Sequence, residues 1–222
     1  MRLVFLGRPG AGKGTQALRA ATEFDLVHVS TGELLRTAMR QGTKLGKEAK
    51  GYVDEGRLVP DELVVKLVEE SLRRVPDRKG FVLDGFPRNL AQAEALEEAL
   101  RVQGEVLDAV VYFAVRSDTV LERLSGRRTC PKCGRNYHVK LMPPASDGRC
   151  DACGVELIQR KDDRPDAIRE RLSIYDKETA PLIDFYRARG ALVEVPGDDD
   201  EESVARRVST ALATLSDRSG RG

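Results

Sequence analysis

The feature that most constrains the fold is a glycine-rich stretch near the start of the chain, GRPGAGKGT at residues 7–15. A short apolar run at residues 3–6 precedes it, and apolar residues at helical spacing follow it. A buried strand, a glycine-rich turn and a helix N-terminus in this order form a phosphate cradle, because backbone N–H groups and the helix dipole point at the anion. Lys13 adds a mobile positive charge for terminal phosphates.

This stretch departs from the common phosphate-loop pattern at one position. The pattern requires Gly, four residues, Gly, Lys and then Ser or Thr. Gly7, Gly12 and Lys13 fit it. Gly14 stands where the hydroxyl residue is expected, and the hydroxyl follows at Thr15. A glycine-rich turn without a ligand is the alternative, but the strand–turn–helix context favours a phosphate site.

Short apolar runs alternate with helical patterns along the rest of the chain. The predicted strands are residues 2–6, 26–29, 80–84, 109–114 and 191–195. The predicted helices lie near residues 13–24, 31–41, 61–74, 90–102, 117–127, 165–189 and 201–215. This alternation predicts an α/β fold with a parallel sheet covered on both faces, and ligands beyond the carboxyl ends of the strands. That edge would carry Gly7, Ser30, Asp84 and Arg116.

Two segments interrupt the alternation. Residues 30–60 supply two short helical pieces with no strand between them. Ser30 and Glu33 stand at capping-box spacing, which predicts that a helix begins there. Residues 127–163 lack helical periodicity and hold all four cysteines. Both segments are interpreted as excursions from one core, which a chain of 222 residues is long enough to form.

The cysteines form two CxxC pairs, Cys130 with Cys133 and Cys150 with Cys153, separated by sixteen residues. This spacing is typical of a tetrahedral four-thiolate zinc site. Two disulfides are the alternative, which a cytosolic compartment disfavours. Because the protein would fill all four positions, the predicted zinc is structural and offers no open position to a substrate.

Charge and hydropathy exclude several other classes of protein. The 37 Lys and Arg nearly balance the 36 Asp and Glu, which argues against a general polyanion-binding protein. No apolar run reaches the roughly 18 residues of a membrane helix, and the first residues do not resemble a signal peptide. We therefore expect a cytoplasmic protein without membrane or nucleic-acid partners. A zinc ribbon that binds nucleic acid is the alternative, but Tyr137 is the only aromatic residue of that segment.

Several arginines gather around the two excursions and the expected strand ends. Arginine's planar fork suits phosphate oxygens and keeps its charge when partly buried. Arg123 and Arg127 are four residues apart, which predicts that they share one helical face. Asp162 and Asp163 are interpreted as capping or solvated carboxylates, and His138 either packs within its segment or contacts a ligand. The candidate phosphate-binding arginines are Arg36, Arg88, Arg123, Arg127, Arg160 and Arg171.

Taken together, the motifs resemble adenylate kinases of the bacterial type with a long, zinc-containing lid. The resemblance covers essentially the whole chain, and Gly14 is no departure within it because GKGT is the form of the loop in this family. Glu33 and Pro60 stand where relatives often have Asp and Thr. The matching motifs are GRPGAGKGT, STGELLR (30–36), GRLVPDELV (56–64), GFVLDGFPRNLAQAE (80–94), GRR (126–128), the two CxxC pairs and RKDDRPDAIRERL (160–172).

The resemblance implies a fold, a division into parts and a reaction. The fold is that of P-loop nucleoside monophosphate kinases, a five-stranded parallel sheet flanked by helices with two inserted subdomains. The core would comprise residues 1–29, 60–126 and 164–222, the AMP-binding flap residues 30–59, and the zinc-binding lid residues 127–163. The implied reaction is MgATP + AMP ⇌ 2 ADP, catalysed by a monomer in adenine nucleotide homeostasis.

The resemblance also implies roles for individual residues. ATP would contact Gly10, Ala11, Gly12, Lys13, Gly14, Thr15, Arg123, Arg127, Tyr137 and Gly197. AMP would contact Thr31, Arg36, Arg57, Leu58, Val59, Gly85, Arg88, Gln92, Arg160 and Arg171. The catalytic set would be Lys13, Arg88, Arg123, Arg160 and Arg171.

The resemblance also implies two metal sites, and two alternative functions stay open. Asp84 would lie near a hydrated Mg²⁺ that accompanies ATP, and the four cysteines would hold a structural Zn²⁺. Another nucleoside monophosphate kinase is one alternative, and a non-catalytic nucleotide or nucleic-acid binder with a zinc ribbon is another. Gln92 favours AMP, because a side-chain amide carries both a donor and an acceptor for the Watson–Crick edge of adenine.

Overall fold

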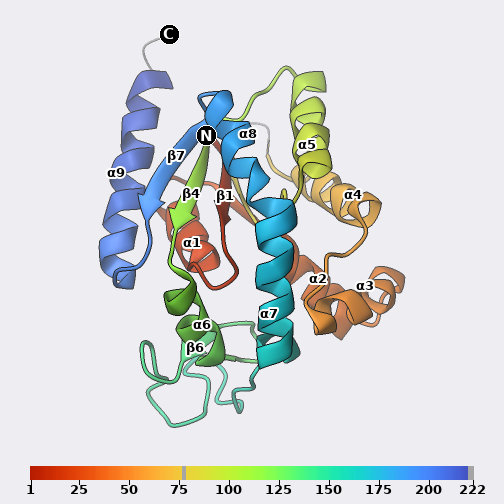
Figure 1. Ribbon diagram of the computed structural model, residues 1–222, viewed down its shortest axis with the longest axis vertical. Helices are drawn as coiled ribbons and strands as arrows, with labels where there is room; N and C mark the ends of the chain where they lie inside the picture. Colours follow the sequence, from red (N-terminus) through yellow and green to blue (C-terminus); the bar gives the residue numbers. More distant parts are fainter. Residues whose placement is uncertain (77–78, 220–222) are drawn as a thin grey trace.

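A five-stranded parallel sheet lies at the centre of the computed structural model, which describes residues 1–76 and 79–219 (Figure 1). The strand order is β2-β3-β1-β4-β7, and every ladder is parallel. The strands are β1 (Arg2–Gly7), β2 (Val27–Ser30), β3 (Phe81–Asp84), β4 (Ala109–Ala114) and β7 (Leu192–Pro196). This confirms the predicted sheet and its five strands.

The central strand β1 is apolar from Leu3 to Leu6 because helices cover both of its faces. Successive side chains of a strand point to opposite faces. Leu3 and Phe5 pack with the helices α1 (Lys13–Glu23) and α9 (Glu201–Ser219), whereas Val4 and Leu6 pack on the other face. The helices on that second face are α4 (Asp61–Leu72), α5 (Leu90–Val102) and α8 (Pro181–Ala188). A strand buried on both sides reads as a continuous apolar run, and this explains the sequence pattern.

The strand order places a switch point at the end of β1. The chain passes from β1 to β2 and β3 on one side, and then to β4 and β7 on the other. Ligands of open α/β sheets bind at the carboxyl edge beside such a point. Gly7 ends β1 there, and Asp84 lies in register with Ser30 on one neighbour and with Phe5 on the other. The expected edge is therefore formed.

The flap, defined here as residues 30–59, contains the two expected helices, α2 (Thr31–Arg40) and α3 (Lys44–Glu55). Ser30 is the N-cap residue of α2, but its side chain makes no cap hydrogen bond. It donates instead to Asp84 Oδ2 at 3.2 Å, and Glu33 binds arginines. The helix start was predicted correctly, and the capping box was wrong, because each side chain has a charged partner from outside the box.

The lid, defined as residues 127–163, lies at the lower end of the molecule in Figure 1 and holds a small antiparallel pair, β5 (Arg127–Thr129) and β6 (Asn136–His138). The helix before it, α6, covers Ser117–Ser125, and Gly126 is its C-cap residue. The predicted helix through residue 127 is therefore wrong, and Arg123 and Arg127 do not share a helical face.

The ring of His138 packs on Gly126, the C-cap residue of α6. A Cβ at Gly126 would lie 2.2 Å from His138 Nε2, so only glycine fits beneath the ring. His138 Nδ1 accepts hydrogen bonds from the backbone N–H groups of Lys140 and Leu141, at 3.1 and 3.0 Å. The ring proton therefore resides on Nε2, which lies 3.2 Å from the Glu122 carbonyl oxygen. Of the two roles considered for His138, packing within the lid is the one observed.

The predicted helix 165–189 is interrupted. A 3₁₀ turn, η1 (Lys161–Asp163), leads into α7 (Pro165–Ile174), a π-helical turn η2 (Tyr175–Thr179) follows, and α8 begins at Pro181. Proline has no N–H and crowds the preceding turn, so the helix widens before it. The Ala180 N–H accordingly donates to the Tyr175 carbonyl oxygen, five residues back. Among the described helices, none is long and apolar enough to cross a membrane.

Two glycines of α3 allow a matched test of flap packing. A Cβ at Gly46 would lie 2.1 Å from the Ala38 carbonyl oxygen on α2, whereas a Cβ at Gly51 would meet nothing within 4 Å. We expect Gly46→Ala to destabilise the flap by about 1–3 kcal/mol, because α2 and α3 must separate. Gly51→Ala should stabilise α3 by about 0.5–1 kcal/mol through helix propensity. Thermal unfolding and amide hydrogen exchange of residues 31–55 measure both. Equal effects of the two substitutions would contradict this packing.

Candidate active site

The glycine-rich loop between β1 and α1 forms the floor of the site. Gly10 and Gly12 have φ angles of +82° and +90°, a region that favours glycine. A Cβ at Gly10 would also lie 2.8 Å from Leu124 Cγ on α6. Lys13 Nζ donates to the carbonyl oxygens of Gly7 and Arg8, at 2.7 and 2.9 Å. Since an ammonium has three N–H donors, one is left for a ligand.

Asp84 explains the glycine at the hydroxyl position of the loop. A Cβ at Gly14 would lie 3.1 Å from Asp84 Oδ2, so a larger residue would crowd this carboxylate. Ser30 Oγ donates to the same oxygen, and His28 Nε2 lies 4.0 Å from it. Carboxylate oxygens are the ligands that Mg²⁺ prefers. The position of Asp84 beside the loop therefore fits the predicted magnesium role.

A pocket opens between the flap and the core. The structure brings nine of the ten predicted AMP contacts into its wall: Thr31, Arg36, Arg57, Leu58, Val59, Gly85, Arg88, Gln92 and Arg171. The wall also contains residues that were not predicted to contact AMP: Gly32, Leu35, Val53, Gly56, Val64 and Asp162.

A close approach at Gly85 positions Arg88 in this pocket. A Cβ at Gly85 would lie 2.8 Å from Thr31 Oγ1 and 3.3 Å from Arg88 Nη2, and its φ is +81°. Thr31 Oγ1 and Arg88 Nε both donate to the Gly85 carbonyl oxygen, at 2.9 and 2.8 Å. Desolvation lowers the pKa of Arg88 despite the opposing charge of Asp84. This guanidinium would gain from an anion in the pocket.

Lys13 belongs to the same electrostatic cluster as the arginines. Burial lowers the pKa of Lys13 to about 8, the charge of Asp84 opposes that shift, and the positive charges of Arg88, Arg171 and Arg127 add to it. Residues far apart in the sequence therefore face one region between the loop and the pocket. Because these cations repel one another, a bound anion would stabilise the cluster.

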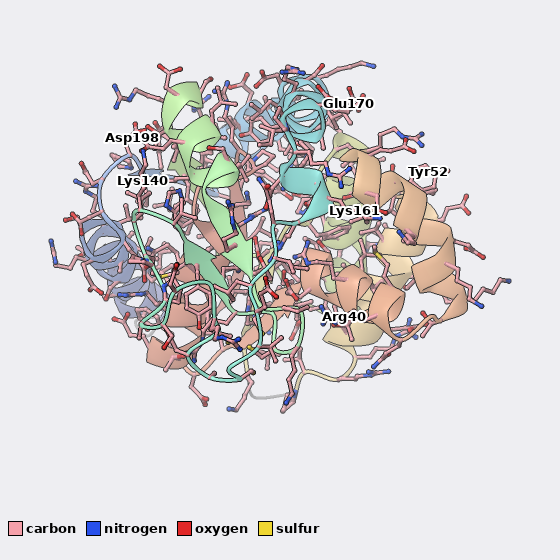
Figure 2. The ribbon with its side chains drawn as sticks, turned by 90° about the horizontal axis from the view of Figure 1, so that it is seen from below. Arg40, Tyr52, Lys140, Lys161, Glu170 and Asp198 are labelled. Atoms are coloured by element: carbon pink, nitrogen blue, oxygen red, sulfur yellow. The ribbon has the colours of Figure 1, made fainter. Side chains whose placement is uncertain are left out.

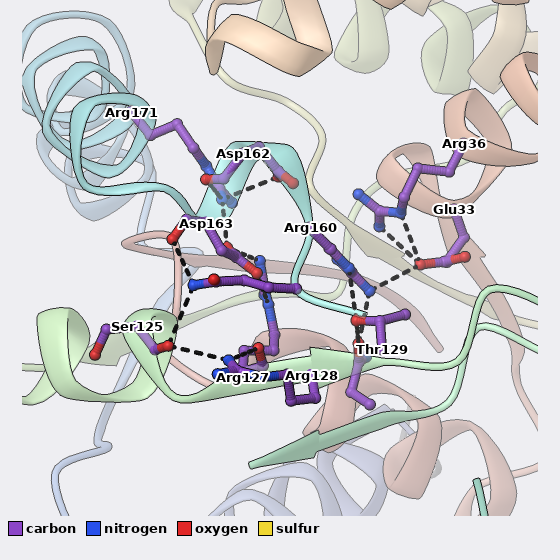
Figure 3. Close-up of polar contacts among 12 residues, drawn as sticks. Glu33, Arg36, Ser125, Arg127, Arg128, Thr129, Arg160, Asp162, Asp163 and Arg171 are labelled. Carbon is purple, nitrogen blue, oxygen red and sulfur yellow. Dashed lines mark hydrogen bonds and ion pairs between the residues drawn. The ribbon is translucent and has the colours of Figure 1, made fainter. Parts of the chain in front are cut away.

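Asp162 and Asp163 are buried within this cluster. Asp163 Oδ2 and Oδ1 accept from Arg127 Nε and Nη2, at 2.7 and 2.5 Å (Figure 3). Arg171 Nη1 lies 3.0 Å from Asp162 Oδ2 and 3.3 Å from Asp163 Oδ1. The interpretation of these carboxylates as capping or solvated groups is wrong. The available signal was their position in RKDDR, where two acids stand among three cations.

Glu33 connects the flap to the lid. Its Oε1 accepts from Arg36 Nε and Nη2, at 3.0 and 2.8 Å, and from Arg160 Nη2 at 3.4 Å (Figure 3). Burial and the charges of Arg127 and Arg36 lower the pKa of Arg160 to about 9, so Arg160 stays charged at neutral pH.

A second contact joins the same two segments. Lys161 Nζ lies 3.1 Å from Asp54 Oδ2 on α3, and Figure 2 shows Lys161 beside the flap helix that carries Tyr52. Flap and lid therefore touch in this structure.

Two predicted ATP contacts lie on the other side of the phosphate loop. Arg123 Nη2 donates to the carbonyl oxygens of Asp198 and Asp199, at 3.3 and 2.9 Å. The Gly197 N–H donates to the Ala114 carbonyl oxygen at 2.9 Å. Burial lowers the pKa of Arg123, and the charges that face it are Asp198, Glu122 and Asp199. In this conformation, Arg123 stands apart from the cation cluster around Lys13.

The four cysteines meet the geometric requirements of a zinc site. Their Sγ atoms all lie within 4.8 Å of one another, and none of the four forms a disulfide. Zn–S bonds of about 2.3 Å in a tetrahedron place sulfur atoms about 3.8 Å apart. The Sγ atoms of Cys133 and Cys150 are 3.6 Å apart, and the Cys133 N–H donates to Cys130 Sγ at 3.5 Å. The residues present therefore fit a structural zinc ion.

Tyr137 packs against this cysteine cluster. It is 4% exposed, and its hydroxyl donates to Cys150 Sγ at 3.4 Å and accepts from the Asp151 N–H at 2.9 Å. Both hydrogen-bonding functions of the hydroxyl are thereby used within the lid. This placement supports a structural role for Tyr137 and does not support its predicted contact with ATP.

Comparison with known proteins agrees with this geometry. A family model described as adenylate kinase matches residues 5–191. An adenylate kinase of Caldanaerobacter subterraneus subsp. tengcongensis is 49% identical over 218 residues, which cover 98% of each chain. One of Archaeoglobus fulgidus is 49% identical over 97% of this chain and 99% of its own length, and one of Moorella thermoacetica is 50% identical over 96% and 98%. The chain therefore belongs to the adenylate kinase family and is a phosphotransferase of the nucleoside monophosphate kinase type.

Proposed function

We propose that the protein catalyses MgATP + AMP ⇌ 2 ADP. The observation that carries this proposal is a single cluster of cations that joins the phosphate loop to the flap pocket. Lys13 lies at the loop, Arg88 lines the pocket, and Arg171 faces both. A donor on the loop and an acceptor in the pocket would place their phosphates on either side of this cluster.

The chemistry requires no nucleophilic side chain. Phosphoryl transfer depends on positioning and on neutralising charge that is spread over the transferred group. In this proposal Arg88 orients the AMP phosphate for in-line attack, and Lys13 with Arg127, Arg160 and Arg171 neutralises the donor phosphates. Mg²⁺ would reduce the charge of the ATP phosphates, and Asp84 is the carboxylate that would hold the hydrated ion.

The flap and lid would exclude water from the transferred group. Water competes with AMP as the acceptor, so closure protects ATP from hydrolysis. The contacts of Glu33 with Arg160 and of Asp54 with Lys161 support closure of residues 30–59 and 127–163 over a core formed by the rest of the chain. Arg123 and Gly197 would border ATP on the side of α6, on which Gly10 packs. We place this activity in the cytoplasm and in a monomer.

A coupled assay of ADP formation tests the proposal. Purified protein with MgATP should turn over AMP much faster than CMP, UMP or GMP. Arg88→Ala should lower kcat by about 10²–10³-fold, by analogy with other electrostatic donors. Arg101→Ala is the control, because Arg101 pairs only with Glu98 on the surface among the described residues. Preference for another monophosphate would make the chain a different kinase of this type, and full activity of Arg88→Ala would exclude the proposed role of Arg88.

Zinc should support stability rather than chemistry. Cys130→Ser removes one ligand, and a loss of about 2–3 kcal/mol would lower Tm by about 5–10 °C in a chain of this size. Turnover well below Tm should change much less. Metal content, calorimetry and the ADP assay measure these effects, with Lys132→Ser as the control at an exposed position of the same turn. A large loss of rate without a change in Tm or metal content would contradict a structural role.

The lowered pKa of Lys13 predicts proton uptake when ATP binds. At about pH 8 half of the free protein would carry a neutral Lys13, and a bound phosphate favours the ammonium form. Binding should therefore take up more protons at about pH 8.5 than at about pH 7. Calorimetry in two buffers of different ionisation enthalpy measures this uptake. Lys13→Met should abolish the increase, and an increase that persists in Lys13→Met would assign the proton to another group.

A further inference from the structure

The residues that hold Gln92 in place are not among the predicted site residues, and they bear on which base the pocket accepts. Gln92 is 1% exposed and lines the flap pocket. Its Oε1 accepts from the Arg88 N–H at 2.8 Å, and its Nε2 donates to Asp61 Oδ1 at 2.6 Å. Within the described part of the chain, these are the two bonds that its amide makes. One N–H and one lone pair of the amide therefore stay available.

Asn89 holds Asp61 in place. Asn89 is the N-cap residue of α5, where its Oδ1 accepts from the Gln92 N–H at 2.9 Å. Its Nδ2 donates to both oxygens of Asp61, at 3.1 and 2.9 Å. Both side-chain functions of Asn89 are thus used, one on the helix end and one on the carboxylate. Asp61 itself begins α4, so this network joins the start of α4 to residues 88–92 at the start of α5.

The chemistry of these partners permits only one orientation of the Gln92 amide. A carboxylate only accepts hydrogen bonds and a backbone N–H only donates them. If the amide rotated by half a turn, its oxygen would face the Asp61 carboxylate and its NH₂ group would face the Arg88 N–H. Both contacts would be lost, and the buried polar groups would be left without partners, which is unfavourable.

The orientation of this amide decides which purine it matches. The available N–H and lone pair suit the N1 acceptor and the 6-amino donor of adenine. A 6-oxo purine presents the reverse pair, N1–H and O6, and would require the rotated amide. Resting on the proposed function, we propose that Asp61, held by Asn89, is the positioning residue that makes the acceptor site specific for a 6-amino purine.

A simpler role for Asp61 predicts a different outcome. Asp61 and Glu62 both lie in the first turn of α4, where carboxylates favour the positive end of the helix dipole. If Asp61 served only the helix, its removal would impair all acceptors alike, and Glu62→Gln would have a similar effect. Glu62 is exposed and is therefore a matched control for charge and position.

The test compares AMP with inosine monophosphate, which differs mainly in the reversed Watson–Crick edge. Asp61→Asn can present either a donor or an acceptor to Gln92, so only the Arg88 N–H still opposes rotation of the amide. The ratio of kcat/KM for AMP to that for inosine monophosphate should fall by about tenfold or more, with the KM for ATP unchanged. Glu62→Gln should leave the ratio at the wild-type value. Calorimetric binding of the two monophosphates provides a readout independent of turnover.

A second variant guards against simple misfolding. Asn89→Ser keeps a helix-capping hydroxyl but removes the amide that holds Asp61, so the same ratio should fall by a smaller factor. If both variants bind and turn over the two monophosphates with an unchanged ratio, Asp61 does not set specificity. Failure of the proposed function is separate, because it would appear in the wild-type protein as an absence of AMP turnover.

Discussion

Lys13 and the arginines around it are buried and repel one another, and the site depends on the carboxylates that hold them together. The charges of Arg36, Arg88, Arg127 and Arg171 each lower the pKa of at least one other cation of the cluster, and each of the carboxylates opposes such a shift. The cations are Lys13, Arg36, Arg88, Arg127, Arg160 and Arg171, and the carboxylates are Glu33, Asp84, Asp162 and Asp163. Six positive charges against four negative charges leave a formal excess of two, which a phosphate group can neutralise.

In the specificity that we propose, a second network, built from amides and one carboxylate, determines which base the acceptor pocket recognises. Around Gln92, the Arg88 N–H, the two side-chain amides and the Asp61 carboxylate form one network in which every hydrogen bond pairs a donor with an acceptor. Such a network is directional, whereas the cation cluster attracts any anion. The cations therefore supply affinity for phosphate, and the amide network is the part that can distinguish one base from another.

The sequence predicted much of this site because the relevant signals are local. A glycine loop after a buried strand, CxxC pairs and apolar alternation each depend on neighbours within a few residues, so the five strands, the phosphate loop and the cysteine cluster were expected. The errors arose where a distant partner decided the outcome. The side chain of Ser30 turned to Asp84 instead of capping α2, and Arg127 left the helix to pair with His138 in the lid ladder of β5 and β6.

By itself, the sequence determined the class of fold, the cradle for phosphate, the candidate metal ligands and the residue types that meet in the pocket. Only the tertiary structure decided the state of each polar side chain: Asp163 buried against Arg127, Tyr137 directed to Cys150, and Gln92 held by Asp61. The physical reason is that a strand or loop pattern records local backbone preferences. The partner of a buried polar group depends instead on which distant segments the fold brings within hydrogen-bonding distance.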